Sequence, residues 1–161
     1  MALTRPPPPR GCSPDDDDDS PPPHRLTVAD LLLVGADAAL LEGIAQTLTA
    51  AGHQVLTATS IDEASFIAAA APPLLAVVDR TLLATASDAR ALGLAPGGAL
   101  VVFGDPASPL PGPVRRTVLA ELRLPLERAR LTALAAHVAA RAHHTGRDAV
   151  SRTPTESQRA L

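Results

Sequence analysis

The stretch Pro73-Leu74-Leu75-Ala76-Val77-Val78-Asp79 decides the fold of this chain. A short apolar run that starts after a proline and ends on a carboxylate is typical of a strand buried on both faces of a parallel sheet. In an open α/β sheet, ligands bind in the crevice outside the carboxyl ends of the strands. Asp79 is therefore the first candidate for a functional residue.

Apolar runs of similar length lie on both sides of this strand, at 31–34 and 99–103. A β-prone run lies at 53–58, and we predict a fifth strand at 118–124, where Glu121 and Arg123 interrupt the apolar pattern. Segments with helical spacing separate them at 37–51 and 60–71, and another follows Pro125, which we place in the first turn of that last helix. The prolines from 106 to 113 predict that the fourth helix is short or lost. The alternation predicts an α/β fold, a doubly wound five-stranded parallel sheet with helices on both faces, of the flavodoxin-like kind.

The two ends of the chain differ in composition from its middle. Residues 1–25 contain proline runs and five consecutive aspartates at 15–19, and residues 147–161 show no sustained period. Such segments bury too little apolar surface to offset the entropy lost on ordering. We predict one domain at 26–146 between disordered segments at 1–25 and 147–161, and the aspartate run is more typical of a solvated tail than of a binding site.

Charge and composition argue against several classes of protein. The net charge is −3, lysine is absent, and residues 26–161 contain 11 arginines against 12 acidic residues, so we expect no nucleic-acid partner. No apolar stretch approaches the roughly 18 residues of a membrane span, so we expect a cytoplasmic protein without a membrane partner. Cys12 is the only cysteine, which excludes an intramolecular disulfide. Neither a Gly-x-Ser-x-Gly elbow nor a glycine-rich phosphate loop is present, so we do not expect an enzyme.

The order of elements from about Leu31 to Val138 resembles the receiver domain of bacterial two-component response regulators. The resemblance is most specific in Gly52-His53-Gln54-Val55, in Ser60-Ile61-Asp62-Glu63-Ala64 and in the strand that ends at Asp79. Leu124-Pro125-Leu126 looks like the lysine-proline-phenylalanine corner of the family. The resemblance implies that Asp79 is the phosphoacceptor, to which a histidine kinase would pass a phosphoryl group while an acidic pair helps to hold Mg²⁺.

The chain departs from the family at most of the positions around this aspartate. Gly35 and Ala36 stand at the acidic pair, Gly104 at the threonine or serine, and Leu124 at the lysine, while the aromatic switch position falls at Glu121. An anionic nucleophile that meets an anionic donor needs a divalent cation and a nearby ammonium group to lower the barrier. We therefore predict a divergent pseudo-receiver.

Three hypotheses of function remain. The first is a stand-alone receiver-like signalling module that binds a protein partner, a histidine kinase or another signalling protein, independently of phosphorylation and without a cofactor. The second is a slow but genuine phosphoacceptor at Asp79, with Mg²⁺ held by Asp37 and Asp105, although both residues also suit N-capping. The third is a small-ligand-binding α/β domain that uses the same sheet edge. The sequence leaves the oligomeric state open.

Overall fold

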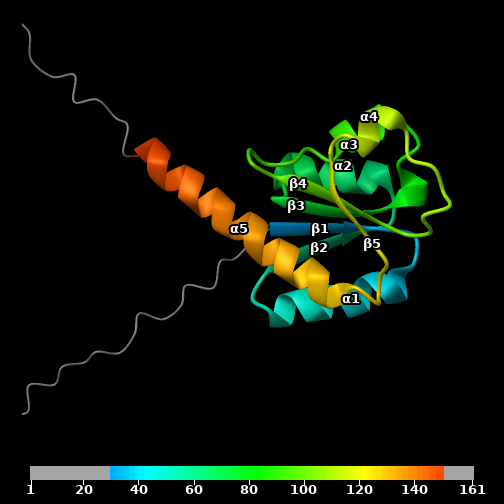
Figure 1. The fold of residues 1–161 in the computed structure, drawn as a ribbon, viewed down its shortest axis with the longest axis horizontal. Coiled ribbons are helices and arrows are strands. Elements are labelled where there is room, and N and C mark those ends of the chain that lie inside the picture. Colours follow the sequence, from blue (N-terminus) through cyan, green and yellow to red (C-terminus); the bar gives the residue numbers. More distant parts are fainter. Residues whose placement is uncertain (1–29, 151–161) are drawn as a thin grey trace, which may run out of the picture.

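A computed structural model describes residues 30–150, in which a sheet lies between two layers of helices (Figure 1). The strands are β1 Asp30–Val34, β2 Gln54–Ala58, β3 Leu75–Asp79, β4 Ala99–Phe103 and β5 Val118–Leu122. The helices are α1 Ala38–Ala50, α2 Ile61–Ala70, α3 Ala86–Ala91, α4 Gly112–Arg115 and α5 Arg128–Val150, with a 3-10 turn, η1, at Arg80–Leu82. Of the segments predicted to be disordered, 1–25 and 147–161, residues 1–25 and 151–161 lie outside the described residues, whereas 147–150 belong to α5.

The strands form one parallel sheet in the order β2-β1-β3-β4-β5. In this order β1 and β3 are neighbours, and the chain adds strands on either side of them, as in a doubly wound fold. Helix α4 has only four residues and contains Pro113. The predicted α/β class, the five-stranded parallel sheet and the short fourth helix are all confirmed.

Alternate strand residues point to opposite faces of the sheet and build two cores. On one face α1 and α5 pack against the sheet through Leu41, Ile44, Leu48, Leu131, Ala135, Val138 and Ala139. On the other face α2, α4 and the end of α3 contribute Ala64, Ala68, Leu92 and Val114. Because both faces are covered, β1 and β3 are buried along most of their length, which explains their continuous apolar sequence.

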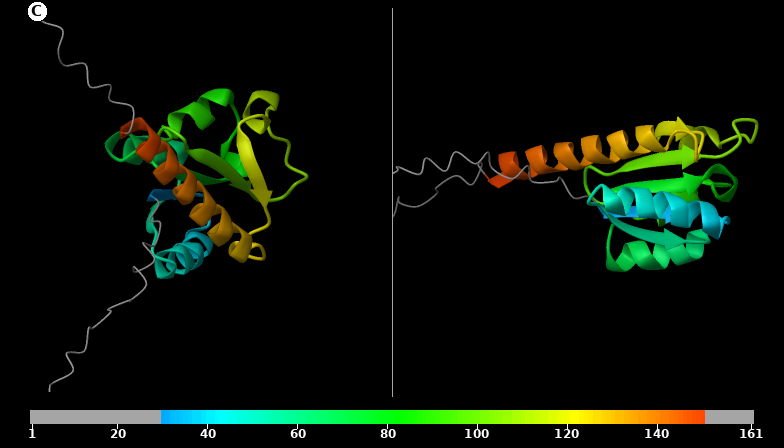
Figure 2. Two further views of the ribbon diagram at one scale, coloured as in Figure 1. Left: turned by 60° about the vertical axis from the view of Figure 1, so that its left-hand side comes forward. Right: turned by 90° about the horizontal axis from the view of Figure 1, so that it is seen from below.

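The last helix differs from the prediction at both ends. It begins at Arg128, and Pro125 lies in the preceding turn, where the Glu127 N–H donates to the Arg123 carbonyl at 2.8 Å. It also continues past Gly146, where we expected it to end, as far as Val150, and Figure 2 shows this end projecting beyond the sheet. Strand β5 stops at Leu122, earlier than predicted, because the chain turns away there.

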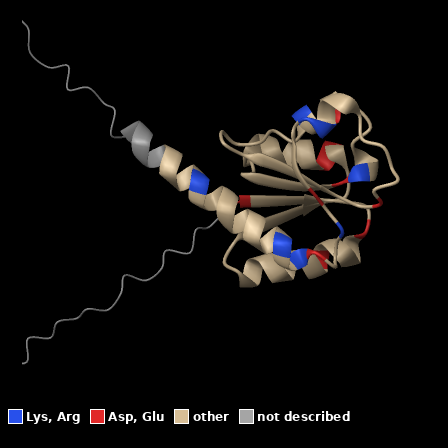
Figure 3. Cartoon of the chain, viewed as in Figure 1, with Lys and Arg blue, Asp and Glu red and all other residues tan. Residues whose placement is uncertain are grey.

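Charged side chains are distributed over several elements in the described part of the chain (Figure 3). Basic residues occur on α3, α4, α5 and the loop before α5, with acidic residues among them. None of the helices within residues 30–150 combines the length and the apolar character that a membrane span needs.

Candidate functional site

Asp79 ends the central strand β3, next to Phe103 of β4 in the sheet register. Its side chain is half-buried, and Oδ1 accepts hydrogen bonds from the Thr81 amide and the Thr81 hydroxyl, each at 2.9 Å. This carboxylate is therefore the N-cap of η1. The predicted position at the carboxyl edge of the sheet is confirmed, and there the side chain stabilises the turn that follows the strand.

Asp37 and Asp105, from the loops after β1 and β4, each accept a backbone hydrogen bond within their own loop. Asp37 Oδ1 accepts from the Leu40 amide at 3.0 Å and caps α1, as predicted. Asp105 Oδ1 accepts from the Ala107 amide at 2.9 Å. Within residues 30–150 no three histidine, cysteine, aspartate or glutamate side chains form a group that could hold a metal ion. Metal binding by Asp37 and Asp105 stays a prediction.

The space next to Asp79 on the β1 side is filled by an aromatic ring. Gly35 is buried, and a Cβ at this position would lie 3.1 Å from Phe103 Cζ, 3.4 Å from Leu41 Cδ2 and 3.7 Å from Asp79 Cβ. Phe103 itself is only 4% exposed. A side chain at Gly35 would therefore require the ring to shift by a few tenths of an ångström in a closely packed core.

On the Gly35 side of Asp79, this arrangement supplies no side-chain ligand for Mg²⁺. The ion needs oxygen ligands in a near-octahedral arrangement and takes one or two of them from carboxylates. Gly35 and Ala36 supply no side-chain oxygen, and a Cβ at Gly35 would lie 3.1 Å from Phe103 Cζ. The β1 side of Asp79 is therefore apolar at the position where the resemblance expects a metal ligand.

Gly104 and Leu124 complete the altered surroundings. Gly104 has a φ of +123°, a conformation that side chains rarely adopt, and a Cβ there would lie 3.4 Å from Asp79 Oδ1. The backbone at this position is thus adapted to glycine. Leu124 precedes Pro125 through a cis peptide bond and packs, half-buried, on the core formed with α1 and α5. An aliphatic side chain that packs on the core therefore stands at the position that the resemblance gave to the lysine.

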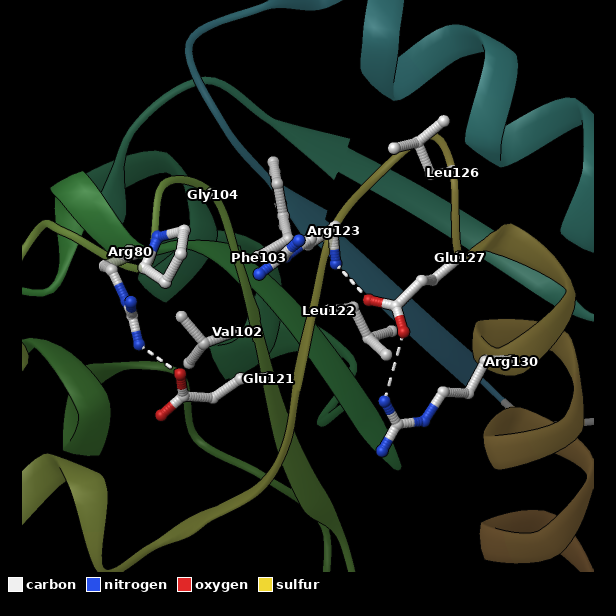
Figure 4. A pocket seen from close by; sticks show the side chains of 11 residues that line it. Arg80, Val102, Phe103, Gly104, Glu121, Leu122, Arg123, Leu126, Glu127 and Arg130 are labelled. Carbon is white, nitrogen blue, oxygen red and sulfur yellow. Dashed lines mark hydrogen bonds and ion pairs between the residues drawn. The ribbon is translucent and has the colours of Figure 1, made fainter.

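Arg80 is a residue of this site that sequence reasoning missed. Only 5% of it is exposed, and its guanidinium group crosses toward β5 (Figure 4). There Nη1 donates to the Asp105 carbonyl at 3.2 Å and Nη2 forms an ion pair with the Glu121 carboxylate. Arg80 thus connects the end of β3 to the β4 loop and to β5, and its partner Glu121 stands at the position that the resemblance gave to the aromatic switch.

The fold and the position of the site define the chain as an open, doubly wound α/β domain with its candidate residues at the carboxyl edge of the sheet. No family model matches the sequence, and no curated protein does. Solved structures of receiver domains do match. The response regulator receiver domain protein from Clostridium thermocellum is 19% identical, with a TM-score of 0.59 over 73% of this chain and 98% of its own.

Two further structures show the same likeness. The CheY-like receiver domain from Methylobacillus flagellatus is 19% identical, with a TM-score of 0.58 over 69% of this chain and 98% of its own. NtrX from Brucella abortus, in complex with ADP, is 21% identical with a TM-score of 0.60 over 83% of this chain, which spans only 31% of NtrX. The chain therefore has the fold of response-regulator receiver domains, as the sequence resemblance predicted. At these identities the likeness establishes the fold alone.

Proposed function

We propose that this protein is a receiver-like signalling module of a two-component or phosphorelay system that acts by binding a protein partner, without phosphorylation of Asp79. The observation that supports the proposal is the packing of Phe103 next to Gly35, on the side of Asp79 where the resemblance expects an acidic metal ligand that phosphoryl transfer would use. Leu124 removes the ammonium group as well. Without either charge, an anionic carboxylate and an anionic phosphoryl donor repel each other.

The fold itself is intact around this altered site. Both cores are complete, and the acidic side chains at the edge have taken up capping roles that stabilise the loops. A domain that keeps its packing while its reactive groups are replaced is suited to binding through its surface. Leu119 on β5 is 45% exposed and Leu126 after it is 86% exposed, which supplies apolar contact area on that side.

The partner that we propose is a histidine kinase or another signalling protein, and the proposal includes no enzymatic activity and no cofactor. Genetic complementation tests it. Deletion of the gene should change a set of transcripts, and Asp79→Asn should restore them as fully as the wild type. Leu126→Asp should fail to restore them while the purified variant remains folded. A normal response from Leu126→Asp together with none from Asp79→Asn would contradict the proposal.

A second candidate is slow phosphorylation of Asp79. It is favoured by one observation: the two hydrogen bonds that this carboxylate accepts both fall on Oδ1, and Oδ2 has no hydrogen-bond partner among the described residues. Acetyl phosphate and Mg²⁺, followed by intact-mass measurement under conditions that preserve acyl phosphates, separate the two candidates. The first predicts no added phosphoryl group. The second predicts an addition that Asp79→Asn abolishes.

A further inference from the structure

A pocket of about 550 Å³ opens on the β5 side of the sheet edge, between the end of β4, β5 and the start of α5 (Figure 4). Asp79 does not line it. Its walls combine apolar groups with charges of both signs, from Arg80, Glu121, Arg123, Leu122, Leu126 and Arg130. A concave site with an apolar wall and a few charged groups is typical of pockets for small molecules.

Arg80 is a buried charged residue of this pocket, and one of its N–H donors has no acceptor among the described residues. The side chain of Arg80 is 4% exposed, and its Nε is fully buried without a hydrogen-bond partner among the described residues. A buried donor without an acceptor destabilises the fold, and it does so more strongly when the group is charged. The guanidinium group therefore lacks an acceptor at Nε.

The existing partner of Arg80 uses only one side of this group. Glu121 accepts from Nη2, while Nη1 donates to the Asp105 carbonyl. A carboxylate or phosphate bound side-on to an arginine accepts from Nε and an Nη together, which is the stronger bidentate geometry. Glu121 is 45% exposed, so it can turn into solvent, whereas the buried Arg80 stays in place.

We propose that this pocket binds a small organic oxyanion, a carboxylate or phosphate on a short apolar body, whose oxygens displace Glu121 and accept from Nε and Nη2 of Arg80. Leu122 and Leu126 contact the apolar body. Arg123 and Arg130 stand at the wall and add positive charge, although Glu127 pairs with Arg130 at 3.2 Å. This ligand site needs neither Asp79 nor a protein partner, and it shares Leu126 with the surface of the proposed signalling function.

The test follows the Arg80 Nε–H signal in ¹H–¹⁵N spectra of the full chain, with calorimetry as a parallel readout. The probes are hexanoate and inorganic phosphate, with neutral hexanamide as the control for the apolar body alone. We expect a saturable shift of the Arg80 signal with at least one anion and none with hexanamide. A response to hexanoate alone identifies a carboxylate ligand, and a response to phosphate alone identifies a phosphate ligand.

Two variants should change the affinity for the anion in opposite directions. Glu121→Gln removes the internal competitor, so it should tighten anion binding at least about threefold. Arg80→Met should weaken binding at least about tenfold. Arg115→Gln on α4, outside the pocket, should leave it unchanged. Absence of saturable binding of both anions, or binding that Glu121→Gln leaves unchanged or weakens, would overturn the proposal, and this second result decides even if Arg80→Met fails to fold.

Discussion

The packing of Phe103 against Gly35 leads to a quantitative prediction for a double-mutant cycle. Gly35→Ala puts a Cβ 3.1 Å from Phe103 Cζ, so overpacking of about 1–3 kcal/mol is partly offset by about 0.4–1 kcal/mol of lost unfolded-state entropy. We expect a net loss of about 1 kcal/mol. Gly35→Asp adds a buried carboxylate next to Asp79, and we expect a loss of about 3 kcal/mol.

Phe103→Leu removes the ring atom that lies nearest to Gly35, at a cost of about 1 kcal/mol. If the ring is what excludes a side chain at position 35, the double variant Gly35→Asp with Phe103→Leu loses less free energy of unfolding than the sum of the two single losses. We expect a coupling of about 1 kcal/mol. Urea denaturation followed by circular dichroism at one fixed pH measures all four free energies of unfolding.

Additive losses, within about 0.5 kcal/mol, would refute this reasoning, because they would mean that Phe103 and position 35 do not compete for the same space. Gly35→Ala combined with Phe103→Leu is the matched control. It repeats the steric part of the cycle without the charge, so the difference between the two cycles isolates the cost of the carboxylate.

Three other predictions concern the loops of the site and the start of α2. The N–H of Thr59, and then its hydroxyl, hold the pKa of Glu63 below its usual value, so this carboxylate stabilises the fold above the unfolded pKa of about 4.3 and loses that contribution as pH falls through the lower folded pKa. Glu63→Gln should therefore flatten the stability profile in that acidic window, and an unchanged profile would contradict the assignment. Gly104→Ala should cost about 2 kcal/mol because its φ is +123°, whereas Gly112→Ala, with open space around it, should be nearly neutral in the same denaturation assay. Asp79→Asn keeps an oxygen that can cap η1 and should change stability by less than about 0.5 kcal/mol, whereas Asp79→Ala should cost about 1 kcal/mol, and equal losses would exclude the capping role.

The order of strands and helices could be predicted because β1, β3 and β4 are short apolar runs, and residues that favour turns or helix ends separate the elements. Asp79 could be placed at the sheet edge for the same reason, since it follows the last apolar residue of β3. Capping of α1 by Asp37 follows from local sequence alone. These features depend on contacts between near neighbours in the chain, which a sequence displays directly.

The contacts that give the site its character join residues that are far apart in sequence. An arginine after a strand is ordinarily solvated, and Arg80 is buried only because the loop after β4 and Glu121 of β5 lie next to it. Gly35 follows β1 and Phe103 ends β4, and β3 lies between these two strands. The Phe103 ring comes close to Gly35 across β3 because glycine has no side chain to block it. The helix start at Arg128 was missed because Pro125 suits a first turn equally well by local preference.

The proposed function requires that no metal ion binds at the sheet edge, and paramagnetic broadening by Mn²⁺, a substitute for Mg²⁺ with similar ligand preference, tests this at single residues. In ¹H–¹⁵N spectra of the wild type, we predict no saturable broadening at the amides of Gly35, Asp79 and Gly104. Broadening confined to these amides, and lost in Asp79→Asn, would show a metal bound at the sheet edge and would contradict the proposal of a phosphorylation-independent module.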